Sequence, residues 1–388
     1  MVRQKQWTLA SGARAAREAR IATVRFLDTP AMAQWHLMRL MAAYAYHKHH
    51  RGDHDLALGQ VYGGMGYQPP YPGWQDGSAL ILADEARYLA QADLFVLSPQ
   101  MCDVVTAAAL TLTIADLALI TAGDLPVPAG IVVLPHPVIC RAVTGDLADT
   151  RAVTWRHPAQ FVQLAAADQR LLPACRVSVY NDAHGPIRPE SFLDFAAQAA
   201  AAGTPLPPLL LDAIRCWPYQ QQITEELAED LERYAAGIRQ MGERAHSRTI
   251  DLGLDEDNVA AGEYTPGDEI DDHDDLFAMR FLYAFWRLCE QRIAVAETVP
   301  ANHAAQVLAA RAGVPADVRV VQLRRRERRP GSGGGDVEWR HRWPVRMHKV
   351  RQWYPSAGTH QILYRGPYVK GPEGKPLIGG DTTWGLVR

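Results

Sequence analysis

Residues 94–97, Leu94-Phe95-Val96-Leu97, contain no polar side chain, and three further short runs rich in strand-forming residues follow at 130–134, 151–155 and 176–180. Helical spacing of apolar residues predicts helices over 31–49, 80–91 and 103–112. Proline pairs at 126–128 and 135–137 favour turns. This mixture predicts a mixed α/β body of the α+β class, without the regular strand–helix alternation of a parallel fold.

The chain has 388 residues, of which 48% are hydrophobic, so it has enough apolar material for a core in one or two domains. Ten acidic residues and no Lys or Arg lie between positions 255 and 275, which is typical of a solvated linker. We therefore predict an acidic α+β body over residues 1–254, an acidic linker or loop over 255–275, and helices with a basic antiparallel β module over 276–388.

Two long helices stand out. Apolar residues at steps of four and three from Leu227 to Met241 place one helix over 224–246. Residues 276–292 are apolar on nearly all sides, apart from a narrow stripe with Arg280 and Arg287. A helix of this kind is buried between layers, and we expect the C-terminal β module to pack on it.

Several protein classes are disfavoured. The five cysteines stand far apart, which argues against a disulfide framework or a zinc site and favours a reducing cytoplasm. Residues 1–20 carry five Lys or Arg without an apolar stretch, which predicts a basic disordered terminus and no secretory signal. No segment has the length and apolarity of a membrane span, and no phosphate-binding motif is present. We expect a cytoplasmic protein with no membrane partner and no cofactor.

The net charge of −3 conceals a split along the chain. Residues 317–388 hold 15 Lys or Arg against six Asp or Glu, a net charge of +9. The other 316 residues have a net charge of −12. Such asymmetry is typical of a local site for a polyanion.

Short strands are predicted within this basic region over 318–323, 337–343, 345–353, 361–364 and 382–387, with a flexible hairpin tip over 330–335. The candidate nucleic-acid-binding residues are Arg340, Arg342, Arg346, Lys349, Arg351, Trp353 and Tyr354. Cations release counterions from phosphates, and rings stack on unpaired bases, which favours single-stranded or looped RNA over duplex DNA. The alternative is a sheet with a solvated cationic face and a tryptophan core.

The histidines of this region are candidates for catalysis. His341 and His348 could act as base and acid of a metal-independent ribonuclease, since an imidazole titrates near neutrality. In a regular strand their seven-residue separation places them on opposite faces, and a bulge at Pro344 would be needed to bring them together. His360 is a third candidate.

Three other polar or irregular segments have simpler interpretations. The histidine-rich run from His47 to Asp55 has residue types that bind metals, but Gly52 interrupts its helical face, so we predict a helix end and no metal site. Asn181, Asp182 and His184 predict a polar turn. The Gly/Pro/Tyr-rich loop over 62–74 could contact a polypeptide, which leaves open a protein-binding adaptor that docks on the ribosome.

Residues 341–356 (HRWPVRMHKVRQWYPS) and 366–372 (GPYVKGP) carry a resemblance to known sequences. They resemble the C-terminal block of a family of uncharacterised proteins spread through actinobacteria, their phages and mobile elements. More distantly, this segment is similar to the subtype V-A anti-CRISPR family, thought to reduce the messenger RNA of its target effector. The resemblance covers about 100 residues, and Lys349 and Val350 depart from the more aromatic and basic pair expected after His348.

The resemblance implies a regulator, linked to a phage or mobile element, that acts near RNA or the ribosome. Together with the charge split, it leads us to expect an RNA-binding post-transcriptional regulator that is not primarily an enzyme. The ribonuclease and the adaptor remain the alternatives. The expected partners are RNA and either the ribosome or a nascent polypeptide.

Overall fold

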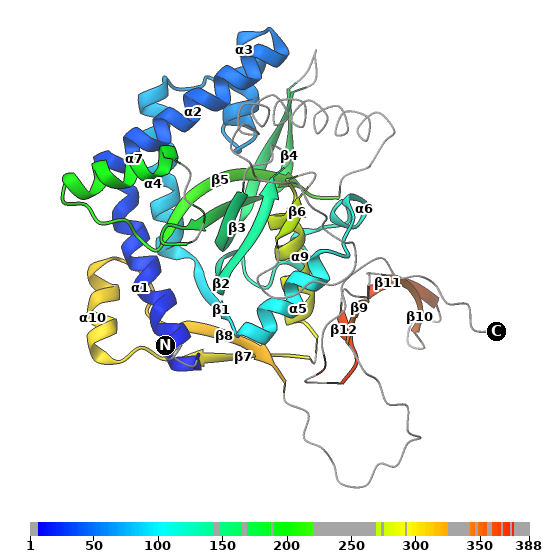
Figure 1. Ribbon diagram of the computed structural model, residues 1–388. Helices are drawn as coiled ribbons and strands as arrows, with labels where there is room; N and C mark the ends of the chain where they lie inside the picture. The colour runs from blue at the N-terminus through cyan, green and yellow to red at the C-terminus, as the bar shows by residue number, and fades with distance from the viewer. Residues whose placement is uncertain are drawn as a thin grey trace, which may run out of the picture.

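The computed structural model describes residues 7–142, 147–164, 169–185, 187, 190–220, 269–272, 275–291, 293–324, 342–345, 348–354, 359–365, 368–372 and 375. Within these residues a mixed eight-stranded sheet carries helices on both faces (Figure 1). The prediction of a mixed α/β body is therefore confirmed. No helix among the described segments is long and apolar enough to cross a bilayer.

The sheet is built around β1 (Asp93–Leu97), which lies parallel to β2 (Ala129–Ala142) on one side and to β8 (Val318–Leu323) on the other. The strand order is β5-β4-β3-β2-β1-β8-β7. Antiparallel strands complete it, namely β3 (Leu147–Leu164), β4 (Gln169–Asp182), β5 (Leu209–Pro218) and β7 (Ala294–Val299). The short β6 (Ile270–Asp272) pairs in parallel with β2.

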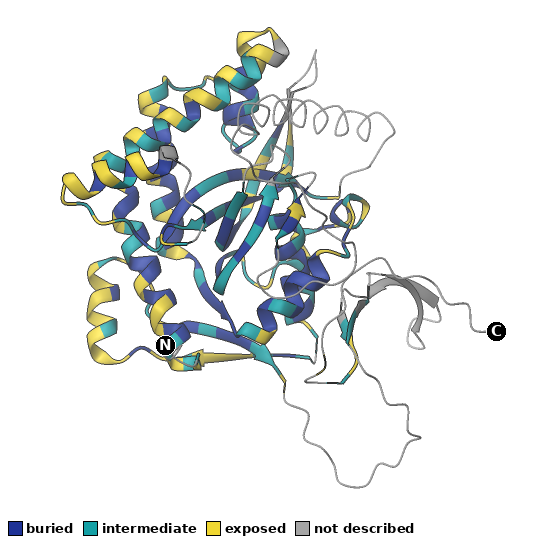
Figure 2. Ribbon diagram, in the orientation of Figure 1, coloured by how far each residue is buried: buried dark blue, intermediate teal, exposed yellow. Residues whose placement is uncertain are grey.

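One face of the sheet is covered by α5 (Pro99–Ala109), α6 (Ile114–Leu117) and α9 (Phe277–Cys289). The aromatic centre of this core contains Trp155 of β3, whose ring lies 5.8 Å from Phe285 and 5.9 Å from Trp286 of α9. Gly130 of β2 allows this packing, because a Cβ there would come within 2.2 Å of Trp155. The centre of the sheet is therefore buried on this side (Figure 2).

The opposite face is covered by α1 (Leu9–Leu27), α2 (Pro30–Arg51), α4 (Trp74–Gln91) and α7 (Glu190–Ala201). Two shorter helices, α3 (His54–Leu58) and α10 (His303–Arg311), lie at the margins (Figure 1). Successive residues of β1 contribute to opposite cores, with Leu94 and Val96 packed beneath α1 and α4, and Phe95 and Leu97 beneath α5 and α9. This burial on both faces explains the uninterrupted apolar run at 94–97.

Most predicted elements of the body are present. The runs at 94–97, 130–134, 151–155, 176–180 and 318–323 all lie in strands, and the helices at 31–49, 80–91 and 103–112 correspond to α2, α4 and α5. The segment Pro135-His136-Pro137 was predicted as a turn, but it is an irregularity within β2, where the pairing register with β3 shifts between Val133 and Val138. The predicted helix over 224–246 lies outside the described residues.

The prediction that the basic N-terminus is disordered is wrong from residue 9 onward. Residues 9–27 form α1, which begins with a capping box between Thr8 and Ser11. Arg17 and Arg20 are buried in it, and Arg20 is fully buried. The guanidinium of Arg20 donates to the carbonyl oxygen of Ala92 at 2.9 Å and to that of Pro315, and Arg17 donates to that of Ala316 at 2.6 Å. Both arginines therefore donate hydrogen bonds within the folded body and do not belong to a solvated arm.

The C-terminal strands form two antiparallel pairs. Strand β9 (Trp343–Val345) pairs with β12 (Tyr368–Lys370), and β10 (His348–Tyr354) pairs with β11 (Thr359–Arg365). The predicted packing on a long apolar helix needs correction. The buried apolar helix α9 has only 13 residues, and β9 and β12 lie against α5.

The domain boundary predicted over 255–275 stays a prediction. The sheet nevertheless contains strands from both sides of it, because β8 pairs with β1 and with β7, and β6, which lies within the predicted linker, pairs with β2. Residues 276–324 therefore share the cores of the body. The predicted hairpin tip over 330–335 and the strand over 382–387 lie outside the described residues.

Arg20 provides a test of the α1 assignment. Replacing it by Met leaves the carbonyl groups of Ala92 and Pro315 without this donor, so we expect a loss of about 2–5 kcal/mol in the free energy of unfolding. Arg14→Met is the matched control, because its side chain is 66% exposed. Urea titration of both variants measures the difference. Equal stability of the two would contradict the structural role of Arg20.

Candidate nucleic-acid interface and a buried ionic cluster

The predicted nucleic-acid-binding residues are only partly within the described structure. His348, Lys349, Arg351, Trp353 and Tyr354 all belong to β10. Arg342 precedes β9, and its Nε donates to the carbonyl oxygen of Lys375 at 2.9 Å. Arg340, His341 and Arg346 lie outside the described residues. Four of the predicted nucleic-acid-binding residues and the catalytic candidate His348 thus lie in one strand.

The register of β10 with β11 pairs cations and rings. Directly opposed positions are His348 with Arg365, Lys349 with Tyr364, and Trp353 with His360. Opposed residues of an antiparallel pair have Cβ atoms about 4.5–5.5 Å apart. The register therefore sets positions with aromatic or imidazole rings opposite positions with basic or imidazole groups in two seven-residue strands.

Arg365 and Tyr364 were missed by the sequence analysis. The strand over 361–364 was predicted, but its partner and register were not. The signal was the separation of two β-like runs by Pro355-Ser356-Ala357-Gly358, a segment of turn-forming residues. With that hairpin recognised, β11 residues would have joined the candidate interface.

The proposed catalytic pair of histidines is not tested by the geometry. His348 lies at the start of β10 opposite Arg365. His341 lies outside the described residues, so the separation of the two imidazoles is undefined. The ribonuclease stays a prediction.

The body contains a buried ionic cluster that sequence analysis did not single out. Helix α4 supplies Asp84 and Glu85, while Arg156 comes from β3 and Arg176 from β4. Arg176 is 4% exposed, and it lies 2.8 Å from a carboxylate oxygen of Asp84 and 3.5 Å from one of Glu85. Arg156 lies 3.3 Å from Asp84. The cluster joins α4 to the neighbouring strands β3 and β4.

Aromatic hydroxyl groups complete this cluster. The hydroxyl of Tyr180 donates to Glu85 at 2.6 Å, and that of Tyr67 donates to Asp84 at 3.2 Å. The guanidinium of Arg176 also lies over the ring of Tyr67, 5.2 Å from its centre. Burial raises the pKa of Tyr67 to about 12, so this phenol stays protonated at neutral pH.

Asp84 and Arg176 of this cluster stay charged near neutral pH. Burial alone would raise the pKa of Asp84, but the hydrogen bond from Arg87 and the charges of Arg176 and Arg156 outweigh it and lower the pKa to about 2. Burial works against the charge of Arg176 as well, yet the carboxylate of Glu85 raises the pKa of the guanidinium. Groups that do not titrate near pH 7 are poorly suited to acid–base catalysis. The arrangement indicates a structural clasp between α4 and the sheet.

The predicted polar turn is present at the end of β4. The backbone N–H of His184 donates to a carboxylate oxygen of Asp182 at 3.0 Å, which forms a local turn. Next to it lies Asp149 of β3, which is 2% exposed and accepts a hydrogen bond from the N–H of Ile187 at 3.3 Å. Gly185 allows this approach, because a Cβ there would lie 1.9 Å from the Asp149 carboxylate.

The aromatic loop over 62–74 contributes its rings to the protein interior. Tyr62 is 1% exposed and stacks on Tyr71 and Trp74, with ring centres 5.4 and 5.8 Å away. His54, from the histidine-rich run, contacts the hydroxyl of Tyr44 through Nδ1 at 2.7 Å. The predicted polypeptide contact through this loop stays a prediction, and these rings are engaged in packing.

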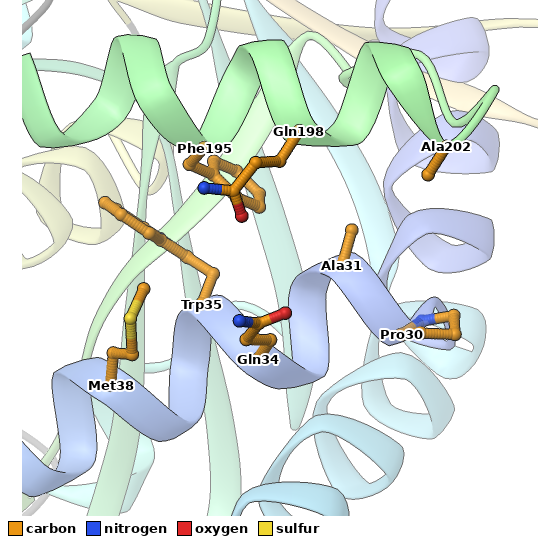
Figure 3. Close-up of a pocket in the computed structure, with 8 residues that line it drawn as sticks. All are labelled: Pro30, Ala31, Gln34, Trp35, Met38, Phe195, Gln198 and Ala202. Atoms are coloured by element: carbon orange, nitrogen blue, oxygen red, sulfur yellow. The ribbon is translucent and has the colours of Figure 1, made fainter.

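A pocket of about 190 Å³ lies between α2 and α7. Figure 3 shows Gln34 and Trp35 of α2 pointing toward Phe195 and Gln198 of α7. The rings of Trp35 and Phe195 stack with centres 4.7 Å apart. The lining carries no ionisable group, so it offers apolar contact and amide hydrogen bonds but no acid–base chemistry.

Arg176 tests the clasp. Arg176→Met leaves Glu85 and Asp84 with less compensation in a buried environment, so we expect a loss of about 3–5 kcal/mol in unfolding free energy. Arg87→Met removes the exposed cation that contacts the same Asp84, and should cost no more than about 1 kcal/mol. Denaturant titration of both variants provides the comparison. A small effect of Arg176→Met would show that the clasp contributes little.

Asp149 should produce a recognisable pH dependence. Burial, together with the nearby charge of Asp182, raises its pKa from 3.8 to about 6 in the folded protein, despite hydrogen bonds that act in the other direction. As the pH rises from 4 to 6, the unfolded carboxyl group ionises before the folded one, so this group progressively destabilises the fold.

Asp149→Asn should remove that part of the slope. The measurement is the urea midpoint of the wild type and the variant at several pH values across this window. The difference between the two curves isolates Asp149 from the other titrating groups. Parallel curves would mean that the carboxyl group has an ordinary pKa.

Comparison with known proteins provides no family for this chain. No protein-family model matches it, and neither a curated protein nor a solved structure does. The resemblance of residues 341–356 and 366–372 to the anti-CRISPR family therefore stays a prediction. The function has to be derived from the chemistry of the residues themselves.

Proposed function

We propose that the C-terminal module binds single-stranded or looped RNA. The observation that carries this proposal is the pairing of β10 with β11, which sets Lys349 opposite Tyr364 and His348 opposite Arg365. A basic side chain beside a ring is the combination that binds a phosphate together with an unstacked base. The local net charge of +9 over residues 317–388 adds long-range attraction for a polyanion.

RNA suits this module better than duplex DNA. In a duplex the bases are stacked inside, so rings on a small sheet have no base face to contact. In a loop or single strand, each exposed base can contribute about 1–3 kcal/mol by stacking on an aromatic side chain. Trp353 and Tyr354 are adjacent at the end of β10 and are the principal stacking candidates.

The wider role we propose is post-transcriptional control, in a protein linked to a phage or mobile element. This part rests on the resemblance of the segment from His341 to Ser356, which implies action on messenger RNA near the ribosome. The strand pair β9–β12 lies against α5 of the body, so RNA on the module would be held beside the body. Binding to RNA, without cleavage, is the activity that the residues support best.

Charge reversal of β10 tests the proposal. The variant Lys349→Glu/Arg351→Glu should weaken binding of a fluorescent single-stranded RNA, because two phosphate contacts become repulsive. If both residues contact phosphates, the slope of log Kd against log salt should decrease by about 1.4, since each contact on a single strand contributes about 0.7. The control is Arg14→Glu/Arg215→Glu, which reverses two exposed arginines of the body, in α1 and β5. Equal weakening by the control would indicate attraction to surface charge in general.

The same RNA separates binding from cleavage. Incubated with the purified protein in EDTA, the RNA should remain intact on a gel. Shortened products that disappear in His341→Ala and in His348→Ala would instead establish the metal-independent ribonuclease.

A further inference from the structure

An open groove of about 520 Å³ lies where α1, α4 and α10 meet, far from β10 in the sequence. Each helix contributes an exposed arginine to it, namely Arg25, Arg87 and Arg311. Arg25 and Arg311 form no ion pair with another residue in the described part of the chain. Three cations from separate helices therefore face one hollow.

The charge of Arg87 is incompletely neutralised. Its guanidinium contacts Asp84 at 2.5 Å, but the same carboxylate also serves Arg156 and Arg176. The buried cluster thus holds three guanidinium groups against the carboxylates of Asp84 and Glu85. One positive charge is in excess, and Arg87 is the most exposed of the three arginines, with 68% of its side chain accessible. Asp28 is the single acid on the groove and offsets one cation.

The floor of the groove is aliphatic. Val24, Ala90 and Ala312 pack together there with Ile21 and Ala309. The remaining apolar lining residues are Leu27, Leu82, Ala83 and Ala86. No described aromatic residue lines the groove, so its described lining offers no ring on which a base could stack.

We propose that this groove binds an acidic, amphipathic peptide segment of a partner protein. Carboxylates would pair with Arg25, Arg87 and Arg311, since the planar guanidinium group donates two parallel hydrogen bonds to a carboxylate. Aliphatic side chains spaced at i, i+3 and i+4 would cover the floor, as in other grooves between helices that receive a helix. Because the groove is open, it suits a peptide that lies along it better than a small molecule, which needs an enclosing cavity.

This site is separate from the proposed RNA interface. Its arginines belong to α1, α4 and α10, and none belongs to the region 317–388. The protein would then carry two charged recognition surfaces with different ligands, one for RNA and one for an acidic polypeptide.

The experiment is a selection of displayed random peptides, about 16 residues or four helical turns long, on the full-length protein. A parallel selection uses Arg25→Glu/Arg311→Glu. Sequences enriched on the wild type and lost on the variant should contain an excess of Asp and Glu together with Leu, Ile or Val. For a synthesised example, the double charge reversal should raise Kd by about tenfold or more, because two attractions become repulsions.

Three further variants test whether the peptide binds in this groove. Arg14→Glu reverses an exposed arginine of α1 outside the groove and should change Kd less than about twofold. Ala83→Trp fills the exposed floor of the groove without changing its charge. It should weaken binding of the peptide as strongly as the double charge reversal does. Lys349→Glu/Arg351→Glu should leave peptide binding unchanged, so a failure of the RNA proposal would not affect this one.

Two outcomes would overturn the proposal. One is a selection in which no enriched sequence depends on Arg25 and Arg311, or in which the dependent sequences are basic. The other is loss of single-stranded RNA binding in Arg25→Glu/Arg311→Glu with no peptide effect, which would assign the groove to RNA. Circular dichroism and thermal unfolding verify that each variant is folded.

Discussion

Strand β1 has no face in contact with water, and the body is organised to cover it. Its four central side chains alternate between two cores, and its backbone pairs with β2 and β8 on its two edges. A strand enclosed on four sides needs helices above and below and partners from distant parts of the chain. The helix layers, the crossover through α5 and the return of residues 318–323 to the sheet all satisfy this one requirement.

Local patterns were sufficient for most of the body, because apolar runs and helical spacing depend on neighbouring residues. They could not predict which residues far apart in the sequence contact each other. The N-terminal arginines illustrate the limit, since Arg17 and Arg20 look like a solvated basic arm until the carbonyl groups of Pro315 and Ala316 are placed beside them. Likewise, the clasp of Asp84, Glu85 and Arg176 joins residues about 90 positions apart. The sequence predicted the candidate residues of β10. Those of β11 could be added only once its pairing register with β10 was known.

Positive charge has two different uses in this molecule. Arg20 and Arg176 are buried and donate hydrogen bonds to oxygen atoms of other elements, so they hold elements together. The arginines of the groove, and the basic residues of β10 in our proposal, serve recognition. Net charge along the sequence does not separate these uses. Burial does, because a buried cation must be paired while an exposed one is available to a ligand.

The hydrogen bonds of α1 also have a consequence for folding during synthesis. Arg20 and its acceptor Pro315 are 295 residues apart, so this bond can form only after the intervening chain has been made. At about 5–20 residues per second, that interval is roughly 15–60 seconds. During it, the part of α1 that packs with Ala309 and Val314 and the edge of β1 that pairs with β8 are uncovered. An unpaired strand edge is a template for pairing with another chain, so the edge of β1 is the place where contact between growing chains would begin.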